Sequence, residues 1–134
     1  MDLSAVGKFK KIMVIDDSKM DRFIAEVLIK RALIADELIV KESAIDAIEY
    51  LETIKVTHLF PDIIFLDIRM PEMDGFEFLD VFTQFEDTIK ANTKVIMLSS
   101  SSNPLDHSKS FEYPNVTGFI VKPLTEEKLR NHFI

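Results

Sequence analysis

The chain of 134 residues contains no cysteine, few glycines and no apolar run approaching the length of a membrane-spanning helix. Without cysteine, neither a disulfide framework nor a thiolate metal site can form. A helix needs about 20 consecutive apolar residues to cross a bilayer, so we expect no membrane insertion. The segment from Met1 to Lys11 also lacks the apolar core of a signal peptide, and a cytoplasmic location is therefore expected.

Clustered positive charge is missing as well. The formal net charge is -7, and no stripe of lysine and arginine interrupts the acidic composition. Proteins bind nucleic-acid phosphates through such clusters, so DNA is not expected as a partner, whereas a bound cation is compatible with the charge. The glycines are Gly7, Gly75 and Gly118, and none of them builds a phosphate-cradling loop. Their positions argue against a nucleotide- or flavin-binding module.

The most informative stretch runs from residue 63 to residue 75. Four consecutive apolar residues, Ile63 to Leu66, are typical of a strand that is buried on both faces. A single carboxylate, Asp67, follows where this strand ends, and a proline-containing turn and an Asp-Gly pair come next. The pattern places a charged side chain directly at the end of a buried strand.

Other apolar runs predict strands in the ranges 12–15, 38–40, 95–98 and 119–121. Helices are predicted over 18–33, after Ser43, along an apolar face from Phe78 to Phe85, weakly between 103 and 116, and from Thr125 to Ile134. The first of these helices carries apolar residues at helical spacing: Met20, Phe23, Ile24, Val27 and Leu28. The alternation of strands and helices predicts one α/β domain over residues 1–134, with a parallel sheet, right-handed crossovers and helices on both faces.

Polar residues stand at the ends of four predicted strands. Asp16 and Asp17 follow the first, Asp67 the third, Ser99 the fourth and Lys122 the fifth. Each feature alone has an ordinary explanation, since an Asp pair commonly caps a helix, a Lys-Pro pair forms a turn and a serine run forms a solvated loop. The carboxyl ends of parallel strands lie on one edge of the sheet, where ligands bind. We therefore expect these side chains to converge.

Three carboxylates in one pocket repel each other, by about 4 kcal/mol for a pair about 4 Å apart at an effective dielectric near 20. Lys122 offsets part of this repulsion, and a set of oxygen ligands suits a hard divalent cation, Mg²⁺ or Mn²⁺. Such a pocket can transfer a phosphoryl group. Asp67 is the predicted nucleophile, the Asp16-Asp17 pair holds the cation, and Lys122 neutralises developing charge on oxygen.

Taken together, these elements resemble the receiver domain of bacterial two-component response regulators, in the single-domain, chemotaxis-regulator-like form. The resemblance covers residues 11–134. It implies a flavodoxin-like, doubly wound (βα)5 sheet with strand order 2-1-3-4-5. The residues that carry it are Asp16-Asp17, Asp67, Met70-Pro71, Met73-Asp74-Gly75, Ser99 and Lys122-Pro123.

The resemblance also implies a role for each acidic residue. Asp67 accepts a phosphoryl group from a phosphohistidine on a sensor histidine kinase or a histidine phosphotransfer protein. Mg²⁺ is held by Asp17, Asp67 and the backbone carbonyl of Arg69, and by Asp16 through water. The chain is then a signalling module rather than an enzyme, catalysing only its own phosphorylation and dephosphorylation. Its output is the binding of another, unidentified protein, and the region from 103 to 119 belongs to the responsive face.

By the same resemblance, Lys122 contacts the phosphoryl group, Ser99 supplies the hydroxyl that swings toward it, and Phe119 is the aromatic residue that turns inward afterwards. This chain departs from the family's usual residues at three positions. Ser99 replaces the commoner threonine and has a second hydroxyl, Ser100, beside it. Phe119 lacks a tyrosine hydroxyl, so its rotation acts through packing alone. Arg69 places a long cation near the phosphoryl site, and we expect it to alter the lifetime of the phosphate.

Two alternatives stay open at this point. A Mg²⁺-dependent phosphohydrolase of the haloacid dehalogenase type also uses an aspartate at a strand end, but it needs Asp-x-Asp, and here the sequence is Asp67-Ile68-Arg69. The chain is also compatible with a receiver trimmed from a longer DNA-binding regulator. His58, His107 and His132 show no ligand or triad spacing and are expected at the surface.

Overall fold

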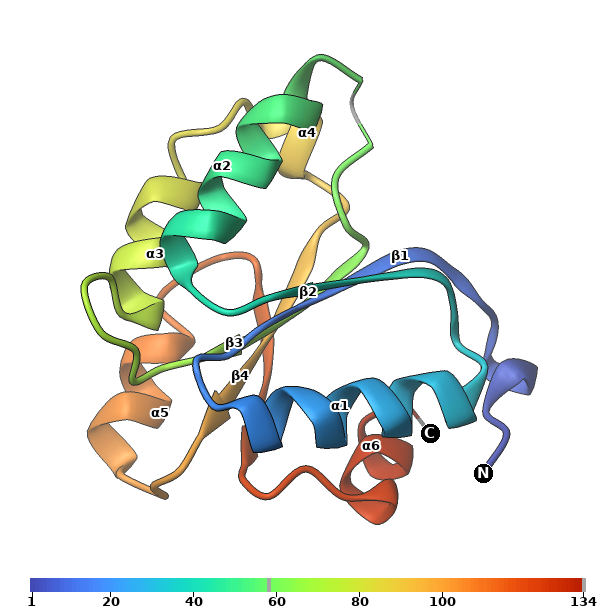
Figure 1. Cartoon of the computed structure of the whole chain (residues 1–134). Helices are drawn as coiled ribbons and strands as arrows, with labels where there is room; N and C mark the ends of the chain where they lie inside the picture. Colours follow the sequence, from blue (N-terminus) through green and yellow to red (C-terminus); the bar gives the residue numbers. More distant parts are fainter. Residues whose placement is uncertain (58, 134) are drawn as a thin grey trace.

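Five parallel strands form one sheet in the order β2-β1-β3-β4-β5 (Figure 1). The computed structural model describes residues 1–57 and 59–133. The strand order and the parallel arrangement confirm the predicted fold. The strands are β1 (Phe9–Ile15), β2 (Ala35–Lys41), β3 (Ile63–Asp67), β4 (Lys94–Ser99) and β5 (Val116–Val121).

Helices connect the strands and cover both faces of the sheet. They are α1 (Lys19–Ala32), α2 (Ala44–Ile54), α3 (Gly75–Phe82), α4 (Asp87–Lys90), α5 (Pro104–Ser110) and α6 (Glu126–Phe133), with 3-10 turns η1 (Ser4–Val6) and η2 (Lys55–Thr57). Within the ranges 1–57 and 59–133, no helix combines the length and apolar character that crossing a bilayer requires.

The side chains of the sheet alternate between two cores. On one face, Ile12, Val14 and Phe65 are buried together with α1 and α6. On the other face, Met13 and Leu66 pack with α2 and α3. Figure 1 shows α1 and α6 on one side of the sheet and α2 and α3 on the other. The central strand β3 is buried along its whole length, as its continuous apolar run predicted.

The register of the strands brings their carboxyl ends level with one another. In β1, Ile15 lies beside Leu66 of β3, so the residues after them are neighbours across the sheet. In β4, Ser99 lies beside Val121, the last residue of β5. The polar residues that follow these strands therefore meet at one edge, where the sequence predicted a site.

The apolar spacing that predicted α1 marks its buried side only in part, since Leu28 packs against the core but two of the other residues do not. Met20 and Phe23 have exposed fractions of 67% and 63%, whereas the fully buried positions are Ala25, Ile29 and Ala32. Ala25 and Ala32 let the helix approach the sheet closely, and Ile29 fills the core between them. Met20 and Phe23 lie on the outer surface, in the part of the helix that follows β1.

Several boundaries differ from the predicted ones. The predicted apolar face from Phe78 to Phe85 continues past the end of α3: Phe85 lies in the following turn but is still buried, with its ring centroid 5.0 Å from that of Phe60. The one-turn helix α4 was not predicted. A helix does form in the weakly predicted 103–116 region, capped by the Asn103 side chain, which accepts a hydrogen bond from the Leu105 amide. The predicted helix end at Ile134 lies outside the described residues.

Candidate functional site

Three carboxylates meet at the carboxyl ends of β1 and β3. Asp67 is the last residue of β3, and Asp16 and Asp17 directly follow β1. One carboxylate oxygen from each lies within 4.8 Å of the other two. Asp16 and Asp67 are buried while Asp17 is exposed, so the cluster opens to solvent on one side.

Lys122 compensates this negative charge from the end of β5. Its Nζ lies 2.7 Å from Asp16 Oδ2, 3.2 Å from Asp67 Oδ1 and 3.0 Å from Asp21 Oδ2. Burial opposes the charge on Lys122, but the adjacent carboxylates of Asp16 and Asp21 raise its pKa above the usual range, so the amine stays protonated. The sequence predicted this convergence of Lys122 with Asp16 and Asp67.

The third carboxylate is poorly stabilised as an anion. Burial and the nearby charge of Asp16 raise the pKa of Asp67 to about 7, and the attraction of Lys122 only partly opposes them. Asp16 Oδ2 is also buried and accepts no hydrogen bond of good geometry from the described protein, although Lys122 is near. An all-oxygen set with surplus negative charge fits a hard divalent cation such as Mg²⁺. These residues therefore suit the predicted metal.

The loop after β3 is shaped around the Asp67 backbone. The Gly75 amide donates to the Ile68 carbonyl at 2.8 Å, and a Cβ added at Gly75 would lie 2.5 Å from the Asp67 carbonyl oxygen. Only glycine allows this close approach. Asp74 then caps α3 in a capping box with Glu77, which fixes where the helix begins. The Asp74-Gly75 pair thus holds the end of β3 close to the start of α3.

Ser99 lies at the end of β4 and is buried, while the neighbouring Ser100 is exposed. The Ser99 hydroxyl donates to the Ser101 carbonyl at 2.6 Å and accepts from the Ser101 amide at 3.1 Å. The Ser99 carbonyl accepts from the Lys122 amide at 2.7 Å. The hydroxyl is therefore engaged within its own loop, next to the lysine of the site.

Phe119 on β5 is half-buried and packs against the core that contains α2 and α3. Its ring centroid lies 5.0 Å from that of His107 on α5, and the His107 ring also packs at a tilt against Phe111, with centroids 4.9 Å apart. The aromatic side chain is thus partly accessible and is covered from α5. A change in α5 can reach Phe119 through His107.

Sequence reasoning missed two residues at this edge. Asp21 was not among the predicted site residues, yet it contacts Lys122; its place in the first turn of the helix after Asp16 could have indicated this. Asp106 of α5 forms an ion pair with Arg69 at 2.7 Å. No local pattern links these two residues, which are far apart in the sequence.

All three histidines were expected at the surface, and the structure describes two of them. His107 is exposed, as predicted, but the prediction is wrong for His132, which is half-buried against Gly118. Burial, helped by the nearby charge of Lys94, lowers the pKa of His132. The predicted surface position of His58 lies outside the described residues.

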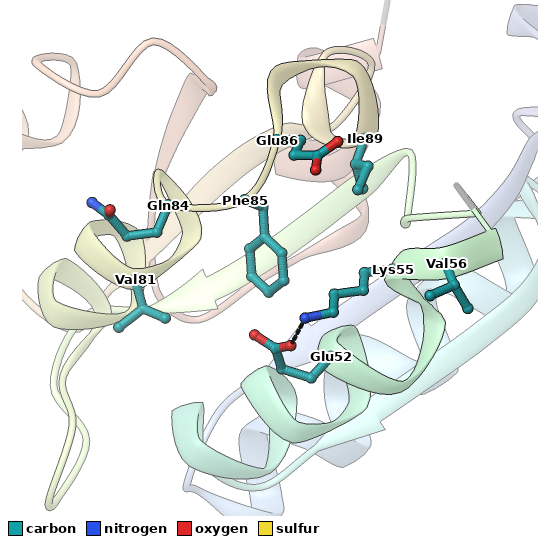
Figure 2. Close-up of a pocket in the computed structure, with 8 residues that line it drawn as sticks. All are labelled: Glu52, Lys55, Val56, Val81, Gln84, Phe85, Glu86 and Ile89. Atoms are coloured by element: carbon teal, nitrogen blue, oxygen red, sulfur yellow. Dashed lines mark ion pairs between the residues drawn. The ribbon is translucent and has the colours of Figure 1, made fainter.

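A surface pocket of about 530 Å³ lies away from this cluster. It is formed by the ends of α2 and α3 together with η2 and α4 (Figure 2). In the chain, η2 comes before β3 and α4 comes before β4. Phe85 and Val56 line it, and Glu52 and Lys55 pair with each other at 2.6 Å on one wall. The pocket shares no residue with the carboxylate cluster.

A family model described as the response regulator receiver domain matches residues 12–134. The chain belongs to this family. Protein PilG of Pseudomonas aeruginosa is 37% identical over 122 residues, which make up 89% of this receiver and 81% of PilG. Chemotaxis protein CheY of Treponema pallidum is 28% identical over 119 residues, 89% of this receiver and 76% of CheY.

Solved structures agree with this assignment. The crystal structure of a two-component response regulator from Cytophaga hutchinsonii has a TM-score of 0.84 and 31% identity, covering 92% of this receiver and 93% of that chain. The receiver is therefore a response-regulator signalling module and not a metabolic enzyme. No comparison supports the haloacid dehalogenase alternative. Receiver domains generally bind Mg²⁺ at an acidic pocket, and the cluster of Asp16, Asp17 and Asp67 supplies one here.

Proposed function

We propose that this chain is a single receiver domain over residues 1–134 that accepts a phosphoryl group on Asp67 and thereby switches its binding to another protein. The observation that carries the proposal is the buried Asp67 carboxylate, which meets Asp16, Asp17 and Lys122 at one edge of the sheet. A nucleophile in this position has its charge partners already in place.

In the transfer, a carboxylate oxygen of Asp67 bonds to the phosphorus of a phosphohistidine. The phosphorus–nitrogen bond breaks, and its electron pair stays on the imidazole, which leaves as a neutral ring after taking up a proton. Lys122 neutralises the charge on the phosphoryl oxygens. Mg²⁺ or Mn²⁺, when bound, adds positive charge at the same oxygens. Asp17, Asp67 and the Arg69 carbonyl would hold it directly, and Asp16 through water.

The product carries about -2 charge where the carboxylate carried -1, so the surrounding hydrogen bonds must rearrange. We infer that Ser99, rather than the exposed Ser100, supplies the responding hydroxyl, because it is buried beside Lys122. Its hydroxyl would exchange the Ser101 carbonyl for a phosphoryl oxygen. Phe119 would then turn inward, and the change would be read through packing because Phe119 has no hydroxyl.

The phosphoryl donor is a phosphohistidine protein, either a sensor histidine kinase or a histidine phosphotransfer protein. The output is binding to a protein rather than to DNA, in keeping with the net charge of -7. Such an exchange takes place in the cytoplasm. Apart from its own phosphorylation and dephosphorylation, the domain catalyses no reaction.

Intact-mass measurement after incubation with Mg²⁺ and acetyl phosphate tests this proposal. We expect one phosphoryl adduct on the parent protein and one on the control Asp36→Asn. Asp36 is an exposed carboxylate on β2 that pairs with Lys8. The adduct should be absent from Asp67→Asn. An adduct that persists in Asp67→Asn, or none on the folded parent, would overturn the assignment of Asp67.

A further inference from the structure

Arg69 connects the loop after β3 to helix α5. Its Nη2 lies 2.7 Å from Asp106 Oδ2 and 3.0 Å from Asp106 Oδ1, so one guanidinium nitrogen contacts both carboxylate oxygens. Figure 1 shows this loop and α5 at the same end of the sheet. Arg69 stands only two residues after Asp67. A single side chain therefore links the phosphoryl-acceptor strand to α5.

The two residues of this ion pair differ in their exposure to solvent. The Asp106 side chain is 11% exposed, whereas the Arg69 side chain is 61% exposed. Within residues 1–57 and 59–133, the ion pair with Arg69 is the one Asp106 forms. A nearly buried carboxylate is strongly destabilised when it loses its cation, whereas an exposed guanidinium is readily solvated elsewhere. The position of α5 thus depends on Arg69 more than Arg69 depends on α5.

We propose that Arg69 is shared between two competing anions, the Asp106 carboxylate and the phosphoryl group on Asp67, so that phosphorylation releases α5. This rests on the proposed function, since it requires a phosphoryl group on Asp67. Asp106 is then a positioning residue that holds the guanidinium beside α5 in the unphosphorylated protein. It acts on the phosphoryl site only through Arg69.

Charge and geometry both favour this exchange. Phosphorylation replaces a carboxylate of charge -1 by a group of about -2, and guanidinium groups bind phosphate oxygens particularly well. The residue after Asp106 is His107, whose ring covers Phe119 at 5.0 Å. Release of Asp106 would therefore loosen the contact that covers the proposed aromatic switch. The ion pair thus gives the loop after β3 a direct connection to α5.

Coupling of this kind is reciprocal, so it is measurable as a binding equilibrium. The probe is beryllofluoride with Mg²⁺, a phosphoryl mimic that coordinates an aspartate oxygen, titrated into ¹⁵N-labelled protein and followed by NMR. Asp106→Asn removes the competing charge and keeps an oxygen acceptor. We expect it to tighten beryllofluoride binding about fivefold, at the low end of typical coupling because Arg69 is mostly exposed.

The decisive comparison repeats the Asp106→Asn substitution in a protein that lacks the Arg69 guanidinium. In an Arg69→Gln background, Asp106→Asn should leave the affinity unchanged, since Asp106 then has no cation to withhold. Amide exchange in α5 should rise on beryllofluoride binding in the parent protein and not in Arg69→Gln. The control Arg130→Gln removes an Arg-Glu ion pair of 2.8 Å from α6 and should behave like the parent.

Failure of the inference and failure of the proposed function look different. If beryllofluoride binding requires Asp67 but Asp106→Asn has the same effect with and without Arg69, Asp106 is merely structural and the inference is wrong. The same conclusion follows if α5 exchange responds equally in the parent and in Arg69→Gln. If the folded parent binds no beryllofluoride, or binds it as tightly in Asp67→Asn, both the proposed function and the inference fail.

Discussion

Replacing Asp67 with asparagine is expected to stabilise the metal-free protein at neutral and alkaline pH. The substitution keeps the size of the side chain and removes one of three clustered negative charges. Lys122 retains its contacts with Asp16 and Asp21, at 2.7 and 3.0 Å, so the cation is not left unpaired. A residue proposed as the functional nucleophile would thus lower the stability of the fold that carries it.

The size and the pH range of the effect follow from the pKa of Asp67. Burial and Asp16 raise this pKa from 3.8 to about 7, so between these values the folded protein keeps a proton that the unfolded chain has lost. The free energy of unfolding therefore falls as the pH rises from about 4 to 7 and is constant above. Three pH units at about 1.4 kcal/mol each set a ceiling of about 4 kcal/mol, and we expect about 2–4 kcal/mol.

Chemical denaturation in EDTA measures this contribution. Unfolding free energies of the parent, Asp67→Asn and the exposed control Asp36→Asn are compared from about pH 4.5 to pH 8. The difference between Asp67→Asn and the parent should grow with pH and reach its plateau above pH 7. Equal stabilities at pH 8, or a less stable Asp67→Asn, would refute the reasoning about the buried charge. Added Mg²⁺ should stabilise the parent more than Asp67→Asn, because the cation needs the third carboxylate.

Three further predictions test other parts of the structure. Gly75→Ala should lower the free energy of unfolding by about 1–3 kcal/mol, because its Cβ would lie 2.5 Å from the Asp67 carbonyl oxygen; unchanged thermal unfolding would contradict that close approach. His132→Gln should weaken the loss of stability below about pH 6.5, because the folded protein resists protonation of this half-buried ring; equal slopes in both proteins would contradict it. Burial and Asp80 raise the pKa of the Tyr113 phenol to about 12, so Tyr113→Phe should remove the ultraviolet absorbance change near pH 12; loss of the change near pH 10 would contradict this.

The strand order and the convergence of Asp67 with Lys122 could be predicted because both follow from local patterns. Continuous apolar runs mark buried parallel strands, and parallel strands place their carboxyl ends on one edge. The sequence alone therefore indicated which polar residues meet. It also located the helix starts at Ser18 and Ser43, where each serine accepts a hydrogen bond from an amide three residues on.

Features that depend on packing at a distance could not be predicted. The exposed side of α1 carries Met20 and Phe23, because helical spacing identifies an apolar stripe without saying whether the protein itself covers it. Phe85 is buried from a turn rather than a helix, since Phe60 and Phe82 provide its pocket. The pairing of Arg69 with Asp106 has no counterpart in sequence spacing, because it depends on where α5 settles against the loop after β3.

Locating the phosphoryl group on the chain tests the central claim most directly. After phosphorylation with acetyl phosphate and Mg²⁺, borohydride reduction converts an aspartyl phosphate to homoserine, and peptide mass spectrometry identifies the position. The account predicts homoserine at residue 67 and unchanged aspartate at Asp16 and Asp17. Homoserine at either of those two residues, with Asp67 intact, would contradict it.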